Sequence, residues 1–144
     1  MATPQTTADE DMTFHFELVS PERKLIEEPA FQVTVPGETG ELGVRKGHTS
    51  LVVSLRPGLV QIMRQKGGMV EKLFVAGGFA DITADNCTLL AEEAVPVAEI
   101  DADKVAAEIQ NLQEDLERAK TPVETDRIAR KITVARAMLR AATA

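Results

Sequence analysis

Hydrophobic and polar residues alternate along most of the first 91 positions. In the first such run, Phe14, Phe16 and Leu18 alternate with polar neighbours, a period of two that is typical of a half-buried β-strand. Comparable short runs follow at 24–27, 31–35, 51–55, 59–64, 69–76, 79–83 and 87–91. Turn sequences separate them and no helical pattern occurs among them, so the segment predicts an antiparallel β-sandwich or flattened barrel.

Four glycines, at positions 37, 40, 43 and 47, punctuate the stretch that follows Val35. Glycine accepts the positive φ angles that other residues resist, so this stretch predicts a tightly turned loop at one end of a sheet. Leu42 and Val44 lie between these glycines, although a solvated turn has no need of apolar side chains. We therefore expect the loop to dock onto another surface.

The hydrophobic period changes after the strands, from two residues to that of a helix. Two apolar stripes, each with spacings of four, three and four, are Val105, Ile109, Leu112, Leu116 and then Ile128, Ile132, Ala135, Leu139. Between them, Thr121 can cap a helix, Pro122 suits its first position and Glu124 completes a capping box. The pattern predicts an antiparallel hairpin of two helices.

These patterns divide the chain into four parts. Residues 1–11 are polar and acidic and predict a disordered tail, and residues 12–92 form the β-sandwich domain. Residues 93–101 form a linker, and residues 102–144 form the helical hairpin.

Charge is distributed unevenly between the two predicted helices. The first is mainly acidic, whereas the second carries only basic charges from Arg127 onward. Arg127, Arg130 and Lys131 can lie off the apolar stripe and form a basic face. Two interpretations stay open here: these cations pair with the acidic first helix, or they bind an acidic surface of a partner.

The composition excludes several classes of protein. The net charge of −7 argues against nucleic-acid binding, and a single cysteine favours a reducing compartment. The N-terminus has neither the apolar region of a signal peptide nor the arginines of a transit peptide. No apolar run approaches the ~20 residues of a membrane span, so we expect a soluble protein that reaches a membrane only through a partner, without direct insertion.

Residues that could act in catalysis or bind a metal are few and scattered. There are two histidines, of which His15 fits a surface strand position and His48 a turn or interface position. Cys87 fits a small buried position, and one cysteine with two separated histidines offers no zinc-site spacing. The glycine-rich stretch precedes a strand, unlike a phosphate-binding loop, which opens a helix. The sequence thus predicts no catalytic residues and no metal site.

Four segments in order resemble the epsilon subunits of bacterial F-type ATP synthases: Val19-Ser20-Pro21-Glu22, VPGETGELGVRKGHTSLVVSLRPGLVQI from Val35, FVAGGFADITADNCTLLAEEAV from Phe74, and Ile100-Asp101. The resemblance runs from about Met12 to the C-terminus. It implies a ten-strand β-sandwich followed by two antiparallel helices, in agreement with the hydrophobic pattern.

The resemblance also implies a function and two sets of contact residues. The family forms part of the rotor, where the sandwich couples the gamma subunit to the ring of c subunits during proton-driven ATP synthesis. It has no catalytic activity of its own, requires no cofactor, and lies at the cytoplasmic face of the bacterial inner membrane. Glu41 and Leu42 would contact the c-ring, and the matched positions for gamma are Ser20, His48, Thr49 and Val52.

The helical hairpin of this family is a regulatory element, which gives an alternative function as an inhibitor of ATP hydrolysis or an ATP-sensing switch. By this resemblance the basic face of Arg127, Arg130 and Lys131 would meet the alpha and beta catalytic subunits. Some members bind ATP through an Ile/Leu-Asp-x-x-Arg-Ala motif. Here Ile100 and Asp101 match, but Lys104 replaces the arginine and a valine follows it. Lysine lacks the bidentate fork of arginine, so we expect weak or no ATP binding.

Overall fold

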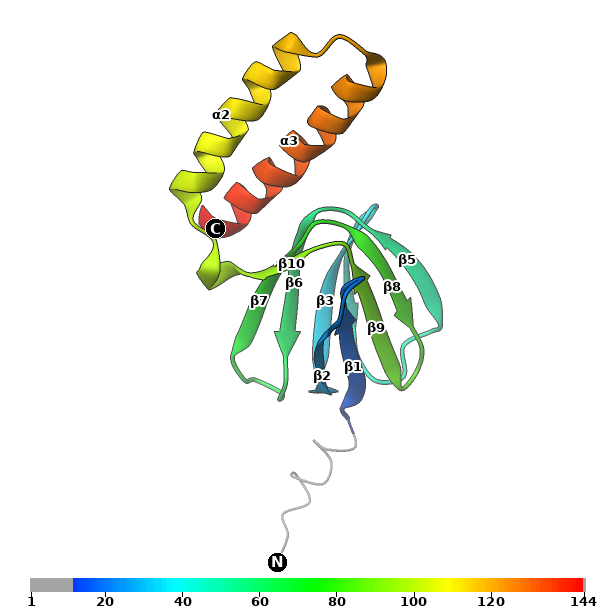
Figure 1. Cartoon of the computed structure of the whole chain (residues 1–144). Coiled ribbons are helices and arrows are strands. Elements are labelled where there is room, and N and C mark those ends of the chain that lie inside the picture. The colour runs from blue at the N-terminus through cyan, green and yellow to red at the C-terminus, as the bar shows by residue number, and fades with distance from the viewer. Residues whose placement is uncertain (1–11, 144) are drawn as a thin grey trace, which may run out of the picture. The chain divides into compact units, whose positions relative to one another are not determined.

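The computed structural model describes residues 12–143 as two compact units, one ending at Ala94 and the other beginning at Val95 (Figure 1). The first is a β-sandwich and the second is a helical hairpin, as the sequence predicted. The predicted disordered tail, 1–11, lies outside the described residues, as does the last residue of the predicted hairpin.

Ten strands make up the sheet. Their bounds are β1 Phe14–Val19, β2 Lys24–Ala30, β3 Gln32–Gly37, β4 Gly40–Val44, β5 Leu51–Leu55, β6 Gly58–Met63, β7 Val70–Val75, β8 Gly78–Ile82, β9 Asn86–Ala91 and β10 Ala94–Pro96. The strand order is β10-β7-β6-β3-β5-β8-β9-β1-β2, and β4 pairs with β3.

One strand pair departs from the expected antiparallel arrangement. Strand β1 runs parallel to β9, with His15 opposite Asn86 and Val19 opposite Leu90. Its other neighbour, β2, is antiparallel, with Phe14 opposite Ala30. Alternation of hydrophobic residues shows which face of a strand is buried but is the same for both directions of pairing, so it could not reveal this ladder.

The core follows the alternation read from the sequence. The inward side chains of β1, β3 and β6 are all buried, including Phe16, Val33 and Ile62, each with no exposed surface. The core cluster of the sandwich is Phe14, Phe16, Leu18, Ala30, Val33, Val35, Val44, Leu55, Val60, Ile62, Leu73, Val75, Ala80, Ile82, Cys87, Leu89 and Ala91. Aliphatic side chains with few aromatic rings therefore fill the space between the sheet faces.

The glycine-rich stretch forms a β-hairpin, not the loop that the sequence predicted. Strands β3 and β4 pair from Val33 opposite Val44 to Gly37 opposite Gly40. At Gly40 the φ angle is +148°, and a Cβ on Gly37 would lie 2.7 Å from the Gly40 carbonyl oxygen, so this turn requires both glycines. The strand was missed because the glycines interrupt its short alternating pattern.

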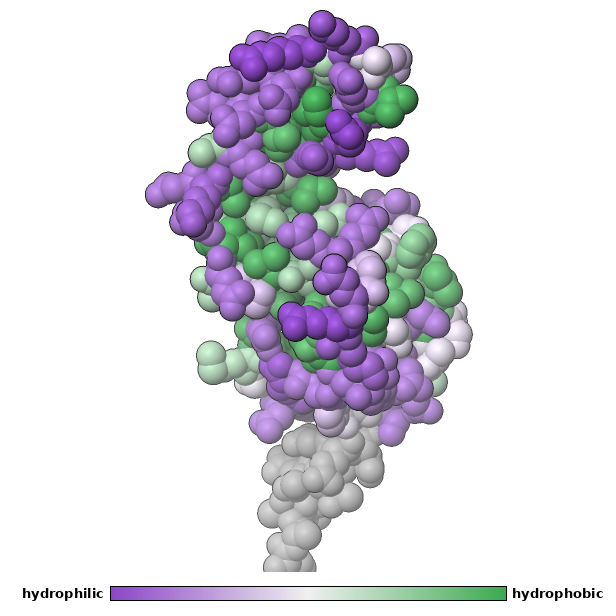
Figure 2. All heavy atoms as spheres, in the orientation of Figure 1, coloured by the Kyte–Doolittle hydropathy of each residue, from purple (hydrophilic) through white to green (hydrophobic). Residues whose placement is uncertain are grey.

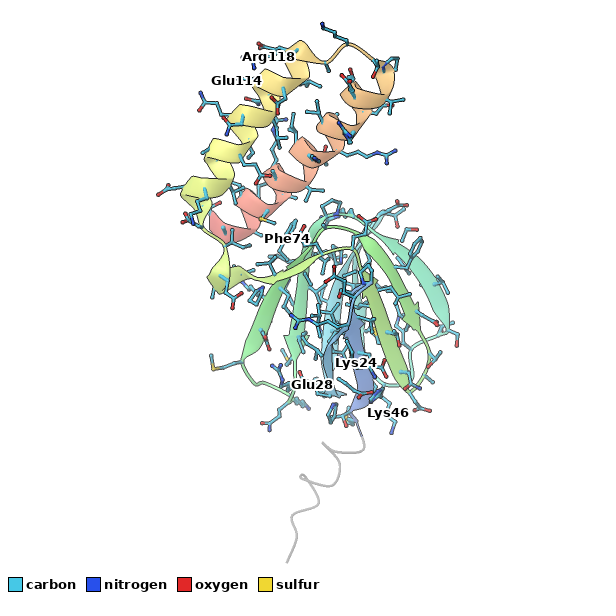
Figure 3. The ribbon with its side chains drawn as sticks, viewed as in Figure 1. Lys24, Glu28, Lys46, Phe74, Glu114 and Arg118 are labelled. Atoms are coloured by element: carbon cyan, nitrogen blue, oxygen red, sulfur yellow. The ribbon has the colours of Figure 1, made fainter. Side chains whose placement is uncertain are left out.

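An ion-pair clasp holds the two ends of the curved sheet near each other. Arg64, just after β6, pairs with Glu28 of β2 and with Glu71 of β7. Strand β2 stands at the far end of the strand order from β7, so the sheet folds back on itself. Glu28, on the edge strand (Figure 3), stands opposite the buried Phe16, and an inward charge of this kind also discourages edge-to-edge association.

The second unit contains the short 3₁₀ helix η1, Val97–Glu99, and the helices α2, Ala102–Arg118, and α3, Pro122–Thr143. Asp101 caps α2, because its Oδ1 accepts hydrogen bonds from the backbone N–H groups of Asp103 and Lys104 at 3.1 and 3.3 Å. At the start of α3, the Thr121 hydroxyl accepts from Glu124 N at 3.1 Å. The Glu124 carboxylate accepts from Lys120 N, one residue before the position that the predicted capping box requires.

The two predicted stripes meet between the helices. Val105, Leu112, Ile132 and Ala135 are buried, and Ile109, Leu116, Ile128 and Leu139 pack against them while partly exposed. The predicted linker is more ordered than expected, because β10 and η1 occupy most of it. Elements of three residues are too short to show a period, which is why the sequence predicted only a linker.

Candidate functional site

The outward face of strands β5, β8, β9 and β1 carries the residues predicted to contact gamma. His48 and Thr49 lie just before β5, Val52 lies on β5, and Ser20 follows the last residue of β1. The pairing places Leu51 opposite Ile82 at one end of these strands and Val19 opposite Leu90 toward the other. The predicted contacts therefore span this face from end to end.

Sequence reasoning missed two apolar residues on this same face. Phe79 of β8 and Leu90 of β9 are direct cross-strand partners, and their exposed fractions are 54% and 50%. Val52, which is 68% exposed, stands one pair away, because its own partner is Asp81 and the partner of Phe79 is Ser54. We call Val52, Phe79 and Leu90 the outer patch. Figure 2 shows hydrophobic residues gathered over the part of the sandwich where Figure 1 draws β5 and β8.

Local hydrogen bonds hold the two ends of this face in shape. The Ser20 hydroxyl donates to the Arg23 carbonyl oxygen at 3.1 Å and accepts from Arg23 N at 3.3 Å. His48 Nδ1 lies 2.7 Å from the Thr49 carbonyl oxygen, and Gly47 N donates to the Ala84 carbonyl oxygen at 2.7 Å. Ser20 and His48 thus belong to well-formed turns beside the outer patch.

The residues predicted to contact the c-ring lie on β4. Glu41 is exposed and stands opposite Pro36. Leu42 packs partly against the sandwich core, and the neighbouring inward position, Val44, is only 1% exposed. The inference that these two apolar residues require an external docking partner is therefore wrong, because the core accounts for both. Contact of Leu42 with a c-ring stays a prediction, and Glu41 is the better placed of the two.

The structure places the basic face of α3 in solvent. Arg127, Arg130 and Lys131 are all exposed. Every ion pair found within 4.0 Å among residues 12–143 belongs to the sandwich. Among the described residues, no ion pair within 4.0 Å joins these cations to acids of α2 such as Glu114 (Figure 3), which favours the interpretation that they bind a partner. The basic face is free to bind an acidic surface.

The remnant of the ATP motif has structural roles. Ile100 packs against the core of the hairpin, and Asp101 is the cap of α2. Lys104 is exposed in the first turn of that helix. The two residues that match the motif thus support the start of α2 whether or not a nucleotide binds.

Cys87 and His15 occupy the kinds of position that the sequence predicted. Cys87 is buried in the sandwich core, and burial raises the pKa of its thiol to about 12. His15 is exposed on β1, with its Nε2 close to the carboxylates of Glu17 and Glu27.

Neither α2 nor α3, nor any other helix within residues 12–143, has the length and apolar character that crossing a bilayer demands.

Comparisons with known proteins agree with this fold. The family model for the "ATP synthase, Delta/Epsilon chain, beta-sandwich domain" matches residues 13–97. The ATP synthase epsilon chain of Maricaulis maris is 41% identical over 86% of this chain and 92% of its own length. That of Rhodospirillum rubrum is 41% identical over 90% of this chain and 96% of its own length.

Solved structures of ATP synthases contain chains with a similar fold. A chain of the Euglena gracilis mitochondrial ATP synthase, solved as an assembly of OSCP, F1 and c-ring, superposes with a TM-score of 0.78 and 25% identity. The match covers 92% of this chain and 82% of that one. A chain of the Tetrahymena thermophila mitochondrial ATP synthase central stalk and c-ring shares the fold, with a TM-score of 0.67 at 15% identity, over 90% of this chain and 96% of that one. With a matched sandwich and relatives aligned along nearly their whole length, this chain belongs to the ATP synthase epsilon-chain family.

Proposed function

We propose that this chain couples the gamma subunit to the c-ring in the central stalk of a bacterial F-type ATP synthase and has no catalytic activity of its own. The observation that carries this proposal is the outer patch, where large apolar side chains stand exposed among residues that the family places against gamma. Apolar groups exposed together on one face mark a surface that a partner covers.

The sandwich suits the transmission of torque. Nine strands continue one after another in a hydrogen-bonded order, and Arg64 links β2, at one end of that order, to β7, next to the other end. The outward side chains of β5, β8 and β9 are carried by paired strands, so their positions are fixed before a partner binds. Pre-formed surfaces lose less conformational entropy on association than flexible ones.

The contact with the c-ring, the second proposed partner, would lie on the β3–β4 hairpin. Its tightly turned backbone presents the exposed carboxylate of Glu41, which suits the polar loops of a c-ring. Through gamma and the c-ring the chain would be held peripherally at the cytoplasmic face of the bacterial inner membrane, without inserting into it.

Adding the chain to membranes depleted of their own epsilon subunit should restore proton-driven ATP synthesis, and failure to do so would reject the proposal.

A second function, inhibition of ATP hydrolysis by the hairpin, is favoured by the free basic face of α3. Arg127, Arg130 and Lys131 have no acidic partner within the described hairpin, and exposed cations bind an acidic surface at little desolvation cost. Acidic segments of the alpha and beta catalytic subunits would be that surface.

Neutralising the basic face should release hydrolysis without affecting synthesis. The variant Arg127→Gln, Arg130→Gln, Lys131→Gln is expected to raise the ATPase rate of the assembled complex severalfold, because the hairpin loses its attraction for the catalytic subunits. A matched control neutralises Glu114, Asp115 and Glu117 of α2 and should leave the rate unchanged. Equal ATPase rates for the triple basic variant and the native chain would reject the inhibitory role.

ATP is expected to bind the isolated chain weakly, with a Kd above about 1 mM. Lys104 supplies a single point charge in place of a fork, and Asp101 already accepts two backbone hydrogen bonds as a helix cap. Calorimetric titration with Mg-ATP measures this directly, and the variant Lys104→Arg, Val105→Ala should bind more tightly. A micromolar Kd for the native chain would contradict the expectation.

A further inference from the structure

Three metal-ligating side chains converge on the outward face of the β1–β2 strand pair. His15 Nε2 lies 2.8 Å from Glu17 Oε1 and 3.2 Å from Glu27 Oε2, and ligand atoms of the three residues all lie within 4.8 Å of one another. His15 and Glu17 share one face of β1 because they are two positions apart, and Glu27 of β2 is the direct cross-strand partner of Glu17. The cluster therefore rests on paired strands and not on a loop.

We propose that His15, Glu17 and Glu27 form a surface site for a divalent transition-metal cation of the zinc class. One imidazole nitrogen and two carboxylates are ligands that Zn²⁺ accepts, at about 2.0–2.2 Å each. In tetrahedral coordination, two ligands of one ion then lie about 3.3–3.6 Å apart. The distances of 2.8 and 3.2 Å from His15 Nε2 are slightly shorter than this, so side-chain rotations that open them by less than about 1 Å would bring the groups onto one ion. Water would complete the coordination.

The arrangement of charge supports a cation at this point. Two carboxylates stand directly opposite each other across the strand pair, which is unfavourable unless a positive charge lies between them. Lys24 now serves as that charge, with its Nζ 3.0 Å from Glu27 Oε2 and 3.7 Å from Glu17 Oε2.

Lys24 competes with the proposed ion and is not a barrier to it. Its side chain is 48% exposed and flexible, so it can swing into solvent when a divalent ion takes its place. Removing this positive charge from the cluster, by Lys24→Gln, should therefore strengthen metal binding. A purely structural ion-pair network makes no such prediction.

Calorimetric titration of the full chain with Zn²⁺ tests the site, with the nuclear magnetic resonance signals of the two imidazole rings as a second readout. We expect one ion per chain and a shift of the His15 signal. His15→Gln should weaken binding at least about tenfold, because loss of a direct ligand should cost at least as much as loss of an outer-shell partner. His48→Gln, which removes the only other histidine of the sequence, should change nothing, and Lys24→Gln should tighten binding severalfold.

Three results would overturn the site: no shift of the His15 signal at millimolar Zn²⁺, equal affinities for His15→Gln and the native chain, or an affinity for Lys24→Gln no tighter than native. All four proteins differ only at side chains that are exposed (His15 and Lys24) or partly exposed (His48), so each should keep the native fold. Protection of the buried Cys87 thiol from alkylation checks that each has done so.

Discussion

Replacing Ile62 with alanine lowers the free energy of unfolding of the sandwich by about 2–5 kcal/mol, as expected for a large aliphatic side chain in a packed core. Ile62 is fully buried on β6, where it stands opposite Val33 of β3. The side chains around it come from paired strands and can collapse only partly into the space that alanine leaves. The loss is a large fraction of the stability of a domain of this size.

The single cysteine supplies the measurement. Cys87 is buried in the same core, so a thiol reagent labels it only when the sandwich opens, and the labelling rate in increasing urea reports the unfolding of this unit alone. Val52→Ala serves as control, because Val52 is 68% exposed and its truncation should cost less than about 0.5 kcal/mol. Equal labelling profiles for the two variants would show that Ile62 is not a core residue.

Replacing Phe79 with glutamate should weaken binding to the gamma subunit about 30- to 1,000-fold, the effect of losing about 2–4 kcal/mol at a central aromatic contact. Phe79 stands between Ser54 and Leu90 on the outward face, with Val52 one pair away. A carboxylate at this point would have to be desolvated against an apolar partner surface. Calorimetric titration with purified gamma gives the affinity.

Met69→Glu is the matched control for this variant, because Met69 is apolar and 93% exposed but lies in the turn before β7, away from the outer patch. It should bind gamma with native affinity. Native affinity for Phe79→Glu, with Cys87 still protected, would show that gamma covers another face of the sandwich.

The burial of strand faces could be predicted from the sequence alone, whereas the neighbours of each strand could not. The alternation of Phe14, Phe16 and Leu18 predicts one buried face of the first strand, and all three residues are buried. Alternation carries no information on which strand pairs with which. The parallel ladder of β1 with β9 and the Arg64 clasp therefore depend on contacts between residues far apart in the sequence.

The candidate site was predicted only in part, and for a physical reason. Phe79 and Leu90 are apolar residues at positions where alternation predicts the solvent face, because Ala80 and Leu89 beside them point inward. That signal was present in the sequence, but only cross-strand pairing shows that the two residues are neighbours. The error at Leu42 was the reverse: an apolar residue among glycines was assigned to a docking loop, although it packs against the core from a strand.

The most direct test of the rotor assignment is a disulfide between Glu41→Cys and a cysteine placed in the polar loop of the c subunit, formed in an assembled, active complex. Met69→Cys is the control, because β3 and β6 are antiparallel and Met69 therefore lies toward the opposite end of the sheet from Glu41. The buried Cys87 should not compete for the crosslink. We predict a crosslink at position 41 and none at 69, with proton-driven ATP synthesis retained because both linked parts turn together. Failure of the crosslink in an active complex, or loss of synthesis once it forms, would contradict the assignment of this chain to the rotor.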